Sequence, residues 1–524
     1  MGDRQRSGGW LSDHVTLIAL AVVGIGCGLR LYHTMGAYLN PDEAQHFLYA
    51  NTGDFVDTYL RSLHTAHPPL LLLVLNATLR AGDSELAMRL PSLLTGTAAL
   101  WLAFRWLQRS AGDAAAVAGL IFLSAAPGMI SVATEVRQYG CLLVGICGAL
   151  YCMERFITER STAWVAAFAL SLYVAILSHY TAAWVTLTLG LYVSLRLWSE
   201  RPPRLIVLSW LLSQTGAAAL YWLFYTTHLH AVRGGGMEGI AITGWLKSSY
   251  YRPGEQTVID FILGATSSAV QHLAGGMIPG AIVGGLFVFG VAAIATRWPR
   301  VDPQVRRDYA VLLTLPVIIG CAAAVDRLLP FGGTRHVNYL LPFIAGGVGV
   351  AVARIFAART MAVLAVSAIL GTLWIANTTP TNNVAQMDRA SMSAALAYLD
   401  DAVPGDSFVL VDGKTHFVLL YYLRGGEKGL RLRGAAALNE TQLHGLRIVS
   451  FPSSWAFEPG QFAGAVHGAI EALQLAPGQP LWVMSVGWMR DEDLEKELPP
   501  SAVLLARRFG RITLLKTAAG YVGS

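Results

Sequence analysis

Residues 67–96 read HPPLLLLVLNATLRAGDSELAMRLPSLLTG, and this stretch contains two apolar segments of different length. The first, from Pro68 to about Arg80, can form a helix that is too short to cross a bilayer, because a spanning helix needs about 20 apolar residues. We expect this helix to lie in the membrane interface. The second segment begins near residue 86 and stays apolar for long enough to span the bilayer.

The composition of the whole chain is that of a membrane protein. Of 524 residues, 54% are hydrophobic and 14% are charged, which is typical of a polytopic membrane protein. The five cysteines fall in apolar segments, so the sequence has neither a disulfide framework nor metal-type cysteine spacing. The net charge of +5 comes from arginines in short loops and indicates no nucleic-acid partner. The N-terminus lacks a clear cleavage site, so we interpret the first apolar run as a retained span.

The apolar segments predict eleven spans, and the fold class is therefore a polytopic α-helical membrane protein. Arginines gather in alternate loops, which predicts a cytoplasmic N-terminus by the positive-inside rule. The loops 33–85 and 227–276 and the C-terminal part are then extracytoplasmic. The predicted spans lie near 14–32, 86–106, 113–131, 138–154, 162–178, 180–197, 205–226, 277–296, 309–325, 336–353 and 360–377.

The long apolar runs end before residue 385, which predicts a transmembrane domain over residues 1–380. Short apolar strands at 446–451, 481–486, 502–507 and 511–515 alternate with helical stretches, which predicts a small extracytoplasmic α/β domain over 385–524. This part has no glycine-rich phosphate loop and no nucleophile elbow. We expect it to cover the membrane site or to hold the acceptor.

The stretch NPDEAQHF, residues 40–47, has two interpretations. Asn40 can cap a helix, Pro41 suits its first position, and Glu43 falls where the acid of a capping box would lie. Acids in a first turn are also favoured by the helix dipole. The alternative is that Asp42 and Glu43 belong to a catalytic site at the membrane surface.

Polar side chains near the predicted outer ends of the spans favour the catalytic interpretation. Each has a local explanation: Glu135 could pair with Arg137, His179 could bond a turn carbonyl, and Arg335 could reach the headgroups. Their convergence from four loops onto one membrane face instead indicates a site. It could supply a base, cations for a phosphate and a groove beside lipid. The residues are Asp42, Glu43, His46, His64, His67, Asp83, Glu85, Arg89, Glu135, Arg137, Tyr139, His179, Tyr180, Arg335, His336, Asn338 and Tyr339.

Four segments resemble the GT-C superfamily of polyprenyl-phosphate-sugar glycosyltransferases. They are PDEAQHFLYA (41–50), the stretch 67–96 quoted above, EVRQYG (135–140) and GGTRHVNYLLP (332–342). The chain looks most like the branch with protein O-mannosyltransferases, the aminoarabinose transferase of lipid A and rhizobial lipopolysaccharide galacturonosyltransferases. The likeness covers roughly residues 10 to 380, and 67–96 is its most specific part.

The resemblance implies inverting transfer of one sugar from a polyprenyl-phosphate carrier to an acceptor outside the membrane. The chain lacks the long lumenal domain of eukaryotic protein mannosyltransferases, so we expect an envelope glycan or glycolipid acceptor and the inner membrane of a bacterium. The resemblance assigns Asp42 as the base with Glu43 beside it, and a divalent metal, present in some relatives, could bind Glu135 with a histidine. Arg137, Arg335 and His336 would bind the donor phosphate, and His46, His67, Glu135, Tyr139, His179, Tyr180 and Tyr339 would line the pocket.

Other functions stay open from the sequence. A secondary transporter of an envelope precursor would show ionisable residues near the midplane, broken helices and internal repeats, and none of these is clear in the sequence. A protein O-glycosyltransferase would use the same donor with a protein acceptor. A non-catalytic scaffold would tolerate alanine at Asp42, Arg137 and Arg335. An oligosaccharide ligase would use a larger donor on a diphosphate.

Overall fold

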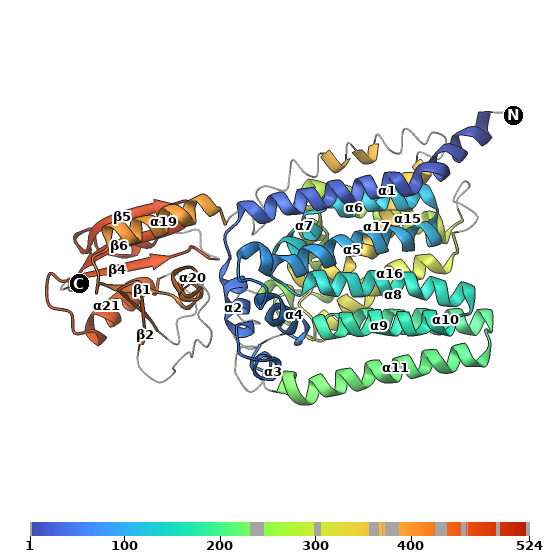
Figure 1. Ribbon diagram of the computed structural model, residues 1–524. Helices are drawn as coiled ribbons and strands as arrows, with labels where there is room; N and C mark the ends of the chain where they lie inside the picture. The colour runs from blue at the N-terminus through green and yellow to red at the C-terminus, as the bar shows by residue number, and fades with distance from the viewer. Residues whose placement is uncertain are drawn as a thin grey trace. The chain divides into compact units, whose positions relative to one another are not determined.

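The computed structural model in Figure 1 forms two compact units. Unit 1 comprises Met1–Tyr32, Tyr59–Val74 and Arg89–Asn382, and unit 2 comprises His33–Thr58, Leu75–Met88 and Asn383–Ser524. Each unit is described by itself. The structure describes residues 3–65, 67–230, 246–297, 305–355, 366–368, 370–372, 387–424, 438–451, 457, 460–488 and 493–519.

Unit 1 is helical. A single large apolar core, with the fully buried Trp106 and Phe343 in it, joins the helices. A π-helical turn η1 (Tyr225–Leu229) extends α11, and 3₁₀ turns form η2 (Lys247–Ser249) and η3 (Arg335–Leu340). The helices are α1 (Asp3–Gly36), α5 (Glu85–Ala111), α6 (Asp113–Ala125), α7 (Pro127–Thr134), α8 (Tyr139–Glu159), α9 (Thr162–Ser178), α10 (Ala182–Glu200), α11 (Arg204–Phe224), α14 (Val258–Ala274), α15 (Met277–Ala295), α16 (Asp308–Val325) and α17 (Leu341–Ile355).

The helices confirm a polytopic membrane protein. Within the described part of the chain, seven helices are long and apolar enough to cross a membrane, or eight if the bent pair α6–α7 is one span. Helices α9 and α10 lie at two further predicted spans, but neither is both long and apolar enough to be counted among these seven. The predicted span 360–377 falls mostly outside the described residues. The predicted outer loop 227–276 contains helix α14.

Arg30 stabilises the break between α6 and α7, which are bent by 58°. Pro127 has no N–H, so the carbonyl of Leu123 loses its helical donor at this break. The fully buried guanidinium of Arg30 donates to the carbonyl oxygens of Leu123 at 3.2 Å and Ser124 at 3.0 Å. Backbone groups inside a membrane must be satisfied by the protein itself, and Arg30 does so here.

Unit 2 is built on a six-stranded sheet of order β2-β3-β1-β4-β6-β5, which confirms the α/β prediction. Strand β1 runs parallel to β3 and β4, and the other pairs are antiparallel. Helix α20 packs against β1, β2 and β3, and α19 packs against β5 and β6. The strands are β1 (Phe408–Val411), β2 (Asn439–Leu443), β3 (Leu446–Ser450), β4 (Pro480–Ser485), β5 (Val503–Phe509) and β6 (Ile512–Ala518). The helices are α19 (Arg389–Ala402), α20 (Gly413–Arg424), α21 (Phe462–Ala472), η5 (Leu494–Glu497) and η6 (Pro500–Ala502).

Two parts of the first predicted outer loop also belong to unit 2. This loop contains α2 (Pro41–Ala50), α3 (Phe55–Ser62) and α4 (Leu70–Leu79), so the two expected short helices are present as α2 and α4. The hydroxyl of Tyr422 on α20 accepts from the N–H of Leu39 at 2.9 Å and donates to Glu85 at 2.8 Å. Residues near both ends of the first outer loop are thereby attached to the C-terminal sheet domain. The boundary predicted at 380–385 stays a prediction.

Candidate functional site

Helix α2 begins with the capping box that the sequence predicts. The side chain of Asn40 accepts from the N–H of Glu43 at 3.0 Å, and the Glu43 carboxylate accepts from the N–H of Asn40 at 2.9 Å. The last turn of α2 is fixed as well, because the side chain of Asn76 donates to the carbonyl of Ala50 at 2.9 Å. Asp42 therefore lies in the first turn of a helix whose two ends are both held.

Asp42 forms an ion pair with Lys414. The ammonium of Lys414 lies 2.8 Å from Oδ1 of Asp42, and the two side chains are only 8% and 11% exposed. His46, one turn further along α2, has Nδ1 2.6 Å from the backbone carbonyl of Asp42. Lys414 was not among the residues singled out in the sequence. The signal that could have pointed to it is the polar run DGKTH directly after strand β1.

In unit 1, close packing of α8 on α5 positions the segment EVRQYG. A Cβ added at Gly140 would lie 2.7 Å from the Thr95 hydroxyl and 3.0 Å from the Ser92 carbonyl, so a larger residue would force these neighbours to move. The Ser92 hydroxyl donates to the carbonyl of Arg137 at 3.1 Å. The same hydroxyl oxygen accepts from the N–H of Arg137 at 3.4 Å. The glycine and the serine together fix the backbone that carries Arg137.

Glu135 and Arg335 join two segments that are distant in the sequence. An Nη atom of Arg335 lies 3.3 Å from Oε2 of Glu135, and the Ser131 hydroxyl donates to the other carboxylate oxygen at 3.1 Å. The Glu135 side chain is buried, whereas that of Arg335 is 27% exposed. The carboxylate that the sequence offered as a partner for Arg137 thus pairs with Arg335.

His179 lies at the centre of the unit 1 cluster. Its ring centroid is 4.9 Å from that of Tyr139, 5.5 Å from that of His67 and 5.8 Å from that of His336. Burial, and then the nearby charges of Arg137 and Arg335, lower the pKa of His179 to about 3. The imidazole is therefore neutral at physiological pH.

The hydrogen bonds of His179 also fix its tautomer. The N–H of Thr181 donates to Nδ1 at 3.1 Å, so Nδ1 is an acceptor and the proton lies on Nε2. Nε2 is buried and has no hydrogen-bond partner among the described residues. An unpartnered buried N–H is costly, and a bound phosphate or hydroxyl oxygen would satisfy it.

Further buried polar atoms come from the segments that carry this cluster. Both amide atoms of Gln138 and the amide oxygen of Asn338 are buried without a hydrogen-bond partner among the described residues. Burial, followed by the charge of Arg335, lowers the pKa of His272 on α14 to about 4. Asn338 was among the polar residues singled out in the sequence, whereas Gln138, which lies within the quoted EVRQYG, and His272 were not.

The remaining predicted pocket residues have more local contacts. The Tyr339 hydroxyl donates to the carbonyl of Pro316 at 3.4 Å and lies against Gly320 of α16. Tyr180 packs its ring near Phe224, with the centroids 6.2 Å apart. The pocket roles of these residues stay predictions.

Two comparisons identify the fold. Residues 66–224 match the family described as dolichyl-phosphate-mannose-protein mannosyltransferase. The chain superimposes on ArnT from Cupriavidus metallidurans bound to undecaprenyl phosphate with a TM-score of 0.53 and 16% identity, covering 98% of this chain and 99% of that one. The chain has the fold of the GT-C glycosyltransferases, and residues 66–224 also match one of their family models. The resemblance seen in the sequence is thereby confirmed.

A second GT-C structure agrees. An oligosaccharyltransferase from Archaeoglobus fulgidus, tethered with an acceptor peptide, gives a TM-score of 0.51 and 12% identity, covering 92% of this chain and 70% of that one. No curated protein sequence matches the chain significantly. At these identities the structural likeness establishes the shared fold, and the donor, acceptor and catalytic residues are argued below from the chain itself.

The described residues do not fit a metal site. Within them, no group of three or more His, Cys, Asp or Glu side chains is arranged to hold a metal ion. Glu135, the carboxylate that the sequence offered as a ligand, is engaged by Arg335 and Ser131. No step of the mechanism proposed for this GT-C protein is routed through a metal.

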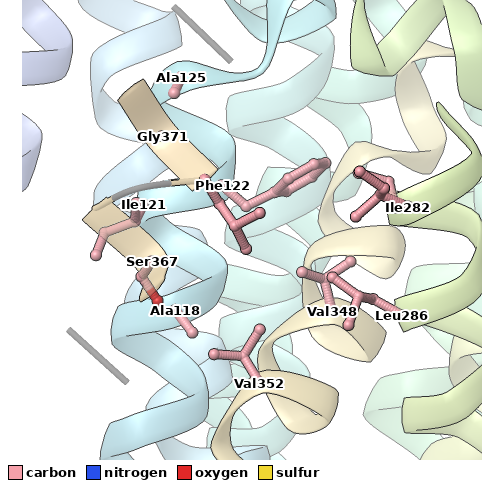
Figure 2. Close-up of a pocket in the computed structure, with 12 residues that line it drawn as sticks. Ala118, Ile121, Phe122, Ala125, Ile282, Leu286, Val348, Val352, Ser367 and Gly371 are labelled. Atoms are coloured by element: carbon pink, nitrogen blue, oxygen red, sulfur yellow. The ribbon is translucent and has the colours of Figure 1, made fainter. Parts of the chain in front are cut away.

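An apolar cavity lies between α6, α15, α17 and the helical residues 366–368 and 370–372 (Figure 2). Side chains including Phe122, Ile282 and Val348 line it, and its volume is about 30 Å³. That is room for about two water molecules and far less than a prenyl chain needs. The Ser367 hydroxyl is buried at this cavity and has no hydrogen-bond partner among the described residues. We therefore assign the cavity no role in donor binding.

Proposed function

We propose that the protein transfers a single sugar from a polyprenyl-phosphate carrier to an envelope glycan or glycolipid acceptor, with inversion. The reaction takes place on the extracytoplasmic side of a bacterial inner membrane, with the N-terminus in the cytoplasm. Asp42 is the general base. Arg137, Arg335 and His179 bind the donor phosphate, and His336 lies beside them.

One observation carries the proposal: the buried polar cluster around His179 combines cations with unsatisfied hydrogen-bonding groups. Arg137 and Arg335 bring two positive charges close to His179, and Glu135 pairs with Arg335. The neutral His179 offers a buried N–H donor. The guanidinium groups would attract a negatively charged phosphodiester, and the donor's oxygen atoms and hydroxyls would satisfy the unpartnered buried atoms.

The chemical step follows from these groups. The acceptor hydroxyl gives its proton to the Asp42 carboxylate as its oxygen bonds to the anomeric carbon. The bond from that carbon to the phosphate oxygen breaks, and the electron pair leaves with prenyl phosphate. The phosphate gains a second negative charge as it departs, so the arginines stabilise the transition state more than the bound donor. Attack opposite to the leaving group inverts the anomeric centre.

Mass spectrometry of envelope glycans and glycolipids tests the proposal. The strains are wild type, a deletion, and the deletion complemented with Asp42→Asn or Asp401→Asn at matched protein levels. Asp401 is an exposed carboxylate of unit 2, so its substitution removes the same charge away from α2. We expect one sugar to vanish on deletion, to return with Asp401→Asn, and to stay absent with Asp42→Asn.

The outcomes separate the alternatives. Full restoration by Asp42→Asn would refute the assignment of the base. A sugar lost from envelope proteins, with glycans and glycolipids unchanged, would favour a protein acceptor, which the description of the matched family makes the main alternative. A deletion that changes no glycan, glycolipid or glycoprotein would refute the proposed reaction altogether.

A further inference from the structure

The ion pair between Asp42 and Lys414 links residues 372 positions apart in the sequence, and both belong to unit 2. The structure gives Lys414 a fixed position. Asp412 follows strand β1 and accepts from the N–H of Thr415 at 2.6 Å, which caps the start of α20. The Thr415 hydroxyl accepts from the N–H of Val486, just after β4, at 3.1 Å.

The first turn of α20 is also attached to the strand on the other side of β1. Nδ1 of His416 lies 2.9 Å from the hydroxyl of Ser450, the last residue of β3. Strands β3, β1 and β4 are parallel neighbours, so these contacts gather at the carboxyl ends of the strands. In α/β sheets this edge is where functional groups are commonly located. Lys414 therefore projects from a rigid edge and not from a free loop.

Helix α2 is held against α20 by more than the ion pair. The rings of Phe47 and Tyr421 meet edge to face with centroids 5.0 Å apart. The Tyr421 hydroxyl donates to the carbonyl of Asp83 at 3.0 Å, and Tyr422 bonds Leu39 and Glu85 as described above. These contacts keep the ammonium and the carboxylate in one arrangement without requiring the ion pair to supply the whole docking energy.

We propose that Lys414 is a positioning residue for Asp42, holding the carboxylate ionised and oriented for proton transfer, so that the C-terminal sheet domain forms part of the catalytic machinery. This inference rests on the proposed function, in which Asp42 is the base. A buried carboxylate without a counter-charge tends to take up a proton, and a protonated acid cannot accept the proton of the acceptor. The compact ammonium of lysine supplies the counter-charge.

Other titratable groups on the two packed helices are few in the described residues. Helix α2 carries Glu43, whose carboxylate is in the capping box, together with His46 and Tyr49. Helix α20 carries His416, Tyr421 and Tyr422 and follows Asp412. Burial raises the pKa of Asp412, which precedes Lys414 by two residues. Among the described side chains of α2 and α20, Lys414 is the one lysine or arginine.

The test uses purified full-length protein added to permeabilised membranes from the deletion strain, which contain their own donor and acceptor. Sugar transfer is followed by mass spectrometry between pH 5.5 and 9 for wild type, Lys414→Met, Lys414→Arg and Asp42→Asn. Lys496→Met is the matched control, because Lys496 also pairs with an aspartate of unit 2 but is 77% exposed. Thermal unfolding of each variant checks that it is folded.

We expect Lys414→Met to lower transfer most at the acid end of this pH range, by up to about tenfold for each unit by which the carboxyl pKa rises. An opposite charge at this distance lowers a carboxyl pKa by about 1–3 units. Without the ammonium, the acid limb of the pH profile of transfer by Lys414→Met should therefore move upward by about 1 unit or more. Activity should then recover at high pH, which a purely structural defect would not produce. Lys414→Arg should keep the acid limb near that of wild type, and Lys496→Met should match wild type.

The possible failures are distinguishable. Transfer by Lys414→Met at the wild-type rate, with an unchanged pH profile, would overturn the role of Lys414. If Asp42→Asn is inactive in the same assay, the assignment of Asp42 as the general base still stands. A loss in Lys414→Met that is equal at every pH, or is not reduced by arginine, would also overturn it. Normal transfer by Asp42→Asn would refute the base itself, and the positioning role with it.

Discussion

Replacing Gly140 by alanine tests how tightly the start of α8 must pack on α5. The new methyl carbon would lie 3.0 Å from the Ser92 carbonyl oxygen, where ordinary contacts begin at 3.4 Å. The Thr95 hydroxyl, at 2.7 Å, can rotate away, but the backbone carbonyl cannot. The two helices must therefore separate by about 0.4 Å at this point.

The expected effects follow from this displacement. Overpacking of this kind costs about 1–3 kcal/mol, and alanine returns up to about 1 kcal/mol through its higher helix propensity. The Ser92 hydroxyl also holds the backbone of Arg137, so the same movement displaces the proposed phosphate ligand. Since a misplacement of 1 Å can cost about 100-fold in rate, we expect about a fivefold loss of transfer.

Thermal unfolding in detergent and sugar transfer into deletion-strain membranes measure the two effects. Gly264→Ala is the control, because Gly264 also lies within a helix and an added Cβ there has no neighbour within 4 Å. It should keep wild-type transfer and unfold at the same or a slightly higher temperature. If Gly140→Ala unfolds and transfers sugar like wild type, the close packing does not position Arg137 and the reasoning is wrong.

Two further predictions concern stability. Arg30→Met removes the donors to the carbonyls of Leu123 and Ser124, so it should lower the free energy of unfolding by about 2–4 kcal/mol. The loss would be measured as thermal unfolding at a lower temperature. Unfolding at the wild-type temperature would refute the capping role. Because the pKa of His179 is lowered to about 3 in the folded protein, the unfolded chain binds more protons between that pH and about 6.5. The free energy of unfolding should therefore fall as the pH drops from 7 to 5. His179→Phe should reduce the slope of this free energy against pH by up to about 1.4 kcal/mol per pH unit. An equal slope in both proteins would contradict the prediction.

Local patterns in the sequence predicted much of this structure. The long apolar runs identify a polytopic membrane protein, because each helix must be apolar over the bilayer thickness. The capping box at Asn40 and Glu43 forms as expected, since it involves only neighbouring residues. Strand β2 was missed because its residues, NETQL, are polar and mostly not buried, so they carry no apolar alternation.

The contacts that assemble the candidate site could not be predicted in the same way. The sequence alone determined the class of fold and the polar residues at the ends of its helices, because hydropathy and capping act over a few residues. Only the tertiary structure decided that Glu135 pairs with Arg335, 200 positions away, and that Lys414 reaches Asp42. Such pairs depend on which surfaces pack together, and packing is set by the shape and burial of the whole core rather than by any short pattern.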